Sequence, residues 1–202
     1  MKVTFFTREY PPNVYGGAGV HVKNLTRELA RTMTVDVRCF GNQDVREGTL
    51  RAKGFSAWPR MWEGEDKIFN SVMGTFSTGL SAVRDRIDSD VVHSHTWYAA
   101  LPGYFAQVLY NVPYVATVHS LEPLRPWKEE QLGRSYHLSS WIEKVALEHA
   151  DRIVAVSHES RNEILKLFTV NPDKVVVIHN GVDLNVWNPS DKDSTRKAYG
   201  IE

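Results

Sequence analysis

The chain has 202 residues, of which 42% are hydrophobic and 24% charged, so it can bury the core of one α/β domain. Its 24 Lys and Arg residues balance its 24 Asp and Glu residues, and no basic run marks a nucleic-acid or membrane partner. Cys39 is the only cysteine, which excludes an internal disulfide and a thiolate metal cluster and indicates a cytoplasmic location.

Short β-rich runs alternate with longer segments of helical period along the chain. This alternation predicts an α/β fold with a Rossmann-like parallel sheet and helices on both faces. The runs are apolar, as strands buried on both faces should be, and the first is too short for a signal peptide. The strand predictions are Val3–Phe6, Val35–Phe40, Asp90–His93, Tyr114–Val118, Arg152–Val156 and, as a sixth, Val175–Ile178.

The first helix is expected between residues 19 and 32, because Val22, Leu25 and Leu29 form an apolar stripe. The second predicted strand is followed by a long stretch, residues 41–65, that glycines and a proline interrupt. We expect this stretch to be an irregular excursion between strand and helix.

Further helices are expected in the rest of the chain, the first of them over residues 68–87. Ser140 and Glu143 have the spacing of a capping box, which predicts a helix that begins at Ser140 and ends near residue 150. Ser157 directly follows a predicted strand, so we expect it to be the N-cap of the next helix.

A glycine-rich loop connects the first strand to the first helix. Gly16 and Gly17 allow the backbone to approach a ligand closely, and the helix N-terminus offers free N–H groups and a positive dipole end. The loop matches neither the dinucleotide fingerprint nor the Walker pattern. A phosphate cradle and a tight strand-to-helix turn therefore both remain open.

The run from His93 to Tyr98 places polar and aromatic side chains at the carboxyl end of a predicted strand, where open α/β sheets bind ligands. His93 and His95 are two residues apart and can face the same way, as a metal pair would. The sequence offers no evident third ligand, so we predict no metal site. Trp97 is either a core residue or an aromatic face for a sugar ring.

The next strand brings His119 to the same edge, so three segments distant in sequence are expected to converge on one cleft. Arg125 and Lys128 follow and either bind an anionic or sugar ligand or remain solvated surface charges. Asn180 follows the last predicted strand in an Asn-Gly pair. That pair is a common turn, yet a residue there would also face any domain that follows.

Five motifs, taken in order, resemble those of glycogen and starch synthases and their relatives among retaining glycosyltransferases of the GT-B fold. The segment 120–128 is most similar to the branch that contains actinobacterial-type glycogen synthase and maltose-1-phosphate synthase and uses ADP-glucose. Val14, where related synthases have lysine, and Thr96, where many have aspartate, favour the maltose-1-phosphate or short glycogen synthase type. The motifs are Glu9-Tyr10-Pro11-Pro12 with Gly16-Gly17-Ala18-Gly19, Val92-His93-Ser94-His95-Thr96-Trp97, Val118-His119-Ser120, residues 150–157 and Asn180-Gly181-Val182-Asp183.

The resemblance implies two Rossmann-like domains that face each other across a cleft. Residues 1–187 would be the N-terminal, acceptor-side domain of such an enzyme. Residues 188–202, where the composition turns polar, would begin the linker to an absent C-terminal domain that binds the nucleotide-sugar. The N-terminal domain alone is expected to be inactive.

The resemblance also assigns roles to single residues. His119 is the expected catalytic residue, in contact with the transferred glucose. Gly16 and Gly17 would lie near the donor diphosphate, and Asn180 would reach the donor sugar. The remaining residues expected to bind substrate are His95, Trp97, Arg125 and Lys128.

The implied activity is the transfer of glucose from ADP-glucose to an α-1,4-glucan with retention of configuration, as in glycogen biosynthesis, with no metal or other cofactor. Three alternatives stay open: maltose-1-phosphate synthesis with glucose 1-phosphate as acceptor, another nucleotide-sugar glycosyltransferase, and a stand-alone carbohydrate-binding module. The expected partners are therefore an α-glucan or sugar-phosphate acceptor and, through the C-terminal domain, the nucleotide-sugar. Neither nucleic acid nor a membrane span is expected.

Overall fold

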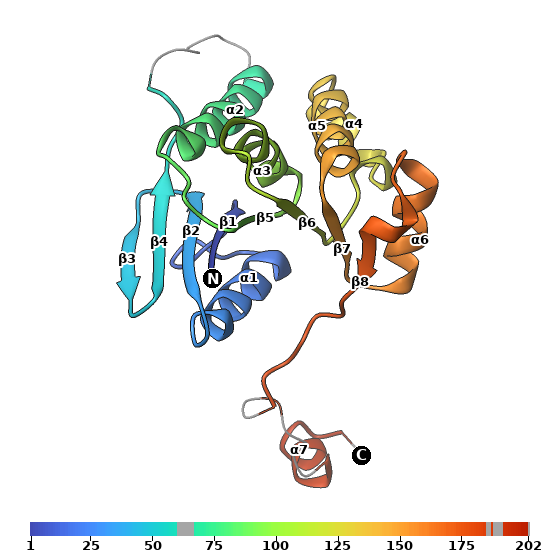
Figure 1. Cartoon of the computed structure of the whole chain (residues 1–202). Coiled ribbons are helices and arrows are strands. Elements are labelled where there is room, and N and C mark those ends of the chain that lie inside the picture. Colours follow the sequence, from blue (N-terminus) through green and yellow to red (C-terminus); the bar gives the residue numbers. More distant parts are fainter. Residues whose placement is uncertain (60–66, 185–186, 188–191, 202) are drawn as a thin grey trace.

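The computed structural model describes residues 1–59, 67–184, 187 and 192–201 (Figure 1). The strands in this part of the chain are β1 (Lys2–Thr7), β2 (Thr34–Phe40), β3 (Asp44–Glu47), β4 (Leu50–Phe55), β5 (Val91–His95), β6 (Tyr114–Val118), β7 (Arg152–Ala155) and β8 (Val175–Val177). They form one sheet in the order β3-β4-β2-β1-β5-β6-β7-β8. All neighbours run parallel except the antiparallel β3–β4 pair, so the predicted Rossmann-like α/β sheet is confirmed.

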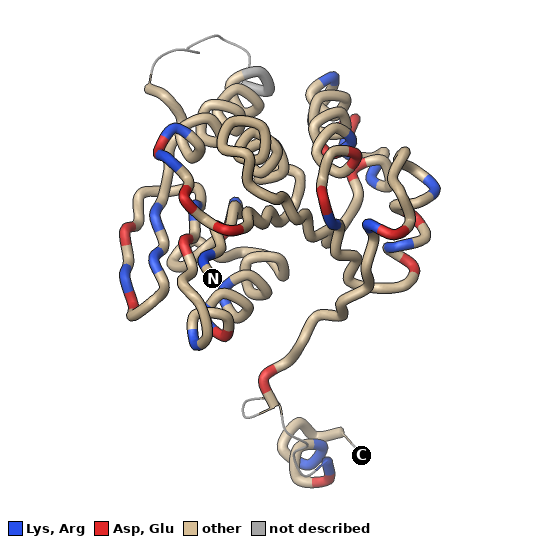
Figure 2. Tube along the Cα trace, viewed as in Figure 1, with Lys and Arg blue, Asp and Glu red and all other residues tan. Residues whose placement is uncertain are grey.

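Helices cover both faces of the sheet. Within the described residues they are α1 (Gly17–Leu29), α2 (Lys67–Arg84), α3 (Trp97–Tyr110), α4 (Trp127–Leu132), α5 (Ser135–His149), α6 (His158–Leu167) and α7 (Lys192–Ala198), with 3-10 turns η1 (Glu122–Leu124) and η2 (Pro172–Lys174). Figure 1 shows α1 on one side of the sheet and α2, α3 and α5 on the other. Elsewhere along the described chain, basic and acidic residues are interspersed, but α3, packed against both α2 and α5, carries no charge (Figure 2).

Strand β1 ties the two layers of helices together. Successive strand residues point to opposite faces, so Phe5 packs on the side of Val22 in α1, and Phe6 packs on the side of Ala100 in α3. Both phenylalanines are fully buried. Burying a phenylalanine stabilises a fold by about 1.5–3 kcal/mol, so these two side chains fix the central strand between its helices.

The prediction of an irregular excursion over residues 41–65 is wrong for the first part of this stretch, which forms a hairpin. Strand β3 turns at Gly48, whose φ is +58°, into β4, which then pairs parallel with β2. Glycine adopts this left-handed conformation without steric cost, so the residue that suggested a loop in fact makes the hairpin turn. Residues 60–65 lie outside the described residues.

The capping box at Ser140 is also wrong, because α5 begins five residues earlier, at Ser135, and Ser140 lies inside it. The preceding helix α4 ends at Leu132, its C-cap Gly133 has a φ of +53°, and α5 starts after this turn. The N-cap prediction at Ser157 is confirmed, since its hydroxyl oxygen accepts the backbone N–H of Ser160 at 3.0 Å. This bond satisfies one of the free donors at the start of α6.

The segment 188–202, predicted as the start of a linker, contains α7, while residues 188–191 and 202 lie outside the described residues. Figure 1 shows α7 away from the sheet, beyond the extended chain that leaves β8. Among the described helices, none combines the length and the apolarity that crossing a bilayer requires.

Candidate active site

Three adjacent parallel strands, β1, β5 and β6, end at the same edge of the sheet. Their register pairs Phe6 with Ser94 and His95 with Thr117. Neighbouring strands lie about 4.8 Å apart. Arg8 just after β1, His95 at the end of β5 and His119 just after β6 therefore lie side by side along this edge.

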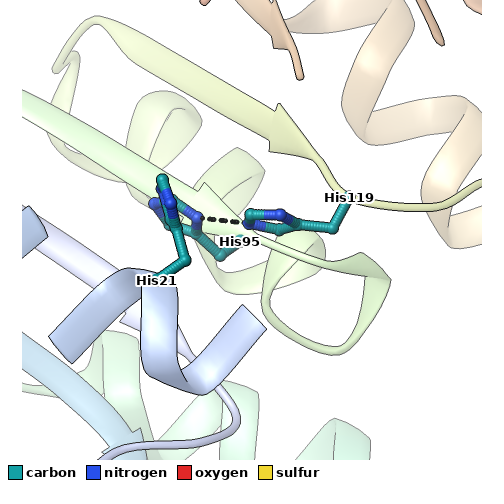
Figure 3. Close-up of side chains that lie close together, drawn as sticks. All are labelled: His21, His95 and His119. Carbon is teal, nitrogen blue, oxygen red and sulfur yellow. Dashed lines mark hydrogen bonds between the residues drawn. The ribbon is translucent and has the colours of Figure 1, made fainter. Parts of the chain in front are cut away.

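Two of these residues and one from α1 form a group that we call the histidine cluster: His21, His95 and His119 (Figure 3). Nδ1 of His95 and Nε2 of His119 are hydrogen bonded at 3.0 Å. The His21 ring lies 5.0 Å from the His119 ring and 5.5 Å from the His95 ring, measured between centroids. The expected convergence of the β5 and β6 tips is thus confirmed.

The histidine cluster is neutral at physiological pH. Burial lowers the pKa of His119 to about 4, with a smaller contribution from repulsion by the charged form of His21. Burial also lowers the pKa of His21 and, more strongly, that of His95. A neutral imidazole has one donor and one acceptor nitrogen, so the cluster is suited to hydroxyl groups. Nε2 of His95 is buried and has no hydrogen-bond partner among the described residues.

The same cluster offers a possible set of metal ligands. One ring nitrogen from each of its three histidines lies within 4.8 Å of the other two. His93, paired with His95 in the sequence analysis, is instead engaged through Nε2 with the Thr117 hydroxyl at 2.7 Å. Three neutral imidazoles are a known zinc-ligand set, so the third ligand that the sequence did not reveal exists in space. That transfer needs no metal stays a prediction.

The glycine loop is partly filled by a carboxylate of this chain. Glu9 accepts the backbone N–H groups of Tyr15 and Gly16 through Oε2, at 3.1 and 2.7 Å. A Cβ on Gly16 would lie 3.1 Å from the Glu9 carboxylate, whereas nothing lies within 4 Å of a Cβ on Gly17. Gly17 is therefore the open glycine, and it starts a helix whose first turn has no acidic residue.

A hollow of about 780 Å³ lies between α1 and the segment that follows β8. Gly17, His21 and Asn180 all line it. Arg27 of α1 forms an ion pair with Asp183 across it at 3.4 Å. The hollow therefore joins Gly17 of the glycine loop, His21 of the histidine cluster and Asn180, as a shared site requires.

A match to a family model shows to which protein family the chain belongs. The model described as Glycosyltransferase Family 4 matches residues 15–186. The chain belongs to this family. Alpha-maltose-1-phosphate synthase of Mycolicibacterium smegmatis is 45% identical over 192 residues, which cover 95% of this chain and 47% of that relative. Glycogen synthase of Mycobacterium tuberculosis is 30% identical over 210 residues, which cover 93% of this chain and 50% of that relative.

A solved structure extends the comparison to the fold. Sucrose-phosphate synthase from Thermosynechococcus elongatus superposes with a TM-score of 0.71 at 16% identity, covering 100% of this chain and 53% of that one. The chain spans about half the length of the curated relatives it matches. The predicted resemblance of this chain to one half of a GT-B glycosyltransferase is therefore confirmed.

Other residues expected to bind substrate have partners within the Family 4 domain. Lys128 and Arg125 contact Oε1 of buried Glu122 at 2.6 and 3.8 Å. Trp97 is 8% exposed and stacks on Tyr98, with ring centroids 3.9 Å apart. A role of Arg125, Lys128 and Trp97 in binding substrate stays a prediction.

Two residues of the candidate site, His21 and Arg8, were not predicted from the sequence. His21 lies four residues after Gly17, one turn along α1, so it shares the face of the helix that meets the strand tips. Arg8 directly follows β1, the position that made His119 a candidate after β6. The rule that ligands bind at the carboxyl ends of strands predicts both residues once it is applied to β1 and its helix.

Proposed function

We propose that this chain is the acceptor-side half of a glucosyltransferase that transfers glucose from ADP-glucose to glucose 1-phosphate, forming α-maltose 1-phosphate with retention. The observation that carries the proposal is the 45% identity to a maltose-1-phosphate synthase across 95% of the chain. Identity to a glycogen synthase is lower, at 30%. Elongation of an α-1,4-glucan, the first expectation from sequence, thus becomes the second candidate.

In this reaction the bond between the anomeric carbon of glucose and the diphosphate oxygen breaks. A bond from that carbon to the acceptor 4-hydroxyl oxygen forms, and the hydroxyl proton passes to the departing ADP. The leaving diphosphate gains negative charge, so the positive end of a helix placed near it lowers the barrier. The open Gly17 at the start of α1 supports a place for the donor there. Further positive charge would come from the partner domain.

The histidine cluster would bind the transferred glucose. Its neutral imidazoles can donate to and accept from sugar hydroxyls without attracting the diphosphate. The hydrogen bond to His95 holds the His119 ring in one orientation, so the second nitrogen of His119 keeps a fixed position relative to the sugar. In this proposal His119 is the catalytic residue, and His95 is a positioning residue that acts through it.

Transfer assays on the full-length protein that carries this chain test the proposal. The protein would be incubated with ADP-glucose and either glucose 1-phosphate or maltotetraose, and ADP release and the product's anomeric signals would be recorded. We expect a higher kcat/KM with glucose 1-phosphate and an α-linked product. A preference for maltotetraose would favour the glucan candidate instead. Transfer to neither acceptor would contradict both.

The stand-alone binding module is distinguished by calorimetry on the 202-residue chain. A module would bind maltooligosaccharides tightly without a second domain. We expect weak glucan binding and negligible transfer by the isolated chain, because it supplies only part of the charge stabilisation that the leaving group needs. Turnover by the isolated chain at the rate of the full-length protein would contradict this division of labour.

A further inference from the structure

The edge of the sheet beside the histidine cluster carries an arginine that no carboxylate in the described part of the chain neutralises. Arg8 directly follows β1 and takes part in none of the ion pairs found there. The adjacent acid, Glu9, is engaged elsewhere, because its carboxylate accepts backbone N–H groups of the glycine loop. A half-buried guanidinium without a counterion favours an anionic ligand.

Aromatic rings hold this guanidinium in place. The central carbon of the Arg8 guanidinium lies 4.0 Å from the centre of the Tyr98 ring and 5.7 Å from that of Tyr15. Tyr98 stacks in turn on Trp97, with centroids 3.9 Å apart and an angle of 28°, and Trp97 belongs to the hydrophobic core. A buried indole therefore supports the phenol ring, and the phenol ring supports the cation.

This arrangement leaves the N–H groups of Arg8 available. A guanidinium that lies over an aromatic face directs its N–H groups outward in its own plane, where two of them match two oxygens of a phosphate. Stacking also removes part of the side chain's conformational freedom before a ligand arrives, which lowers the entropy lost on binding.

We propose that Arg8, supported by Tyr98, binds the phosphate group of a phosphorylated sugar acceptor. This inference rests on the proposed transfer to glucose 1-phosphate, and it names the residue that recognises the acceptor's charge. A phosphate monoester is close to a dianion at neutral pH, and arginine binds it through two parallel charge-assisted hydrogen bonds. An α-glucan acceptor is uncharged and would gain nothing from Arg8.

Arg8 and the N-terminus of α1 are two different positive groups, one for each anion of the reaction. The donor diphosphate is proposed to lie at the N-terminus of α1, beside Gly17. Arg8 lies over Tyr98, in the first turn of α3, at the tip of the neighbouring strand β5. Each anion thus has its own positive pole, and the histidine cluster extends along the same edge of the sheet.

Acceptor kinetics of the full-length protein with Arg8→Gln and Arg8→Lys test the inference. Both variants remove the planar fork, and Arg8→Lys keeps the charge. We expect Arg8→Gln to raise the KM for glucose 1-phosphate roughly 10- to 100-fold, with a smaller rise for Arg8→Lys. We expect kcat/KM with uncharged maltotetraose to fall far less than kcat/KM with glucose 1-phosphate, whereas a general disturbance of the fold would lower both alike.

Matched variants isolate the role of the aromatic support. Tyr98→Phe keeps the ring and should keep the wild-type KM for glucose 1-phosphate. Tyr98→Leu removes the ring and should raise that KM in the same direction as Arg8→Gln. The control is Arg84→Gln, because Arg84 is exposed at the end of α2 and pairs only with half-buried Asp85 among the described residues. It should change no kinetic constant.

A direct binding measurement keeps this inference distinguishable from the proposed function. The 202-residue chain would be titrated with glucose 1-phosphate and, separately, with inorganic phosphate, by 31P NMR. We expect the wild-type chain to bind glucose 1-phosphate and the Arg8→Gln chain to bind it at least about tenfold more weakly. Equal binding by the two chains, or no binding by the wild-type chain, would overturn the inference. Exclusive use of maltotetraose by the enzyme would overturn the proposed function, and the titration would still decide the role of Arg8.

Discussion

The domain contains two clusters of buried polar residues, and they differ in how many of their donors and acceptors have hydrogen-bond partners. The first surrounds Glu122, which is 1% exposed. Its side-chain oxygens accept from Lys128 and from the Ser139 hydroxyl, its carbonyl oxygen accepts from the Tyr136 hydroxyl, and its N–H donates to Glu143. Every polar group of Glu122 therefore has a partner within the chain.

The second group, the histidine cluster, is incomplete. A single hydrogen bond joins His95 to His119, and Nε2 of buried His95 has no partner among the described residues. An unpaired buried polar atom costs about 1–3 kcal/mol, so a fold keeps one where a ligand will use it or where function requires the geometry. The contrast agrees with the proposed function, in which the Glu122 network stabilises the fold and the histidine cluster binds the transferred sugar.

The largest effect that would sharpen this contrast is expected from His119→Ala in the full-length protein. Removing a group that stabilises a transition state typically lowers kcat about 100- to 1,000-fold, and we expect a loss in that range. The free energy of unfolding should fall by about 1–3 kcal/mol, because the substitution leaves Nδ1 of buried His95 without its hydrogen-bond partner. Transfer kinetics and urea unfolding check both parts. His137→Ala, which removes an exposed histidine paired with Glu129, is the control and should leave kcat unchanged.

The opposite pattern is expected for Lys128→Met in the Glu122 network. Loss of this ammonium leaves a buried carboxylate without its nearest cation, and breaking a buried pair costs about 3 kcal/mol. Arg125→Met is the matched control, since Arg125 lies 3.8 Å from the same oxygen and its side chain is 38% exposed. It should cost less than about 1 kcal/mol. If Lys128→Met changed substrate KM and left urea unfolding unchanged, Lys128 would be a binding residue and the contrast would fail.

Both clusters contain residues that were predicted from the sequence as site residues. The partners of these residues, which only the fold shows, decide which of them are free to bind a ligand. His95 and His119 were predicted to converge because each ends a buried apolar strand, and parallel strands end at one edge. Arg125 and Lys128 looked available because Glu122, their partner, is an ordinary acidic residue in sequence and becomes a buried anion only in the folded chain. Burial is a tertiary property, so charge pairing of this kind escapes motif analysis.

Among the described strands, only the hairpin pair β3 and β4 was not predicted from the sequence. The strands β1, β2, β5, β6, β7 and β8 overlap predicted apolar runs, whereas all four residues of β3 are exposed and show no apolar pattern. Helix α3 was not predicted from the sequence, and it contains Pro102 and Gly103, two residue types that disfavour a helix. A Cβ on Gly103 would lie 2.4 Å from the Tyr114 ring, so close packing on β6 requires a glycine where helix propensity disfavours one.

A pH-dependent effect is expected from Glu143 in the satisfied network. Burial, together with the neighbouring Glu122 charge, raises the pKa of Glu143 from 4.5 to about 8. The folded state therefore favours the protonated form, and the stability that this form provides is lost as pH rises from the unfolded to the folded pKa. Between about pH 6 and about pH 8 the wild-type chain should lose about 2 kcal/mol through this group.

Glu143→Gln checks this pH dependence. The amide oxygen can still accept the Glu122 N–H, and the side chain no longer titrates. Urea unfolding at several pH values should therefore give a flatter stability curve for the variant, with the largest gain over wild type at alkaline pH. Parallel curves for the two proteins would mean that Glu143 is already ionised in the folded chain, and the network would then hold two buried negative charges.

The smallest effect is expected from removing metal ions. This experiment tests whether the unpaired nitrogens of the histidine cluster bind sugar hydroxyls or a metal ion. Their geometry suits three-imidazole coordination, but in the proposed reaction the cluster binds sugar hydroxyls and the helix dipole of α1 faces the diphosphate. Incubating the full-length protein with EDTA, followed by desalting, should therefore change kcat by less than about twofold, a change far below the 100-fold effects of losing a transition-state contact. Loss of transfer that Zn²⁺ restores in the wild type but not in His21→Ala would assign the unpaired nitrogens to a metal. The contrast between a satisfied and an open cluster would then remain, with a cation in place of the sugar as the missing partner.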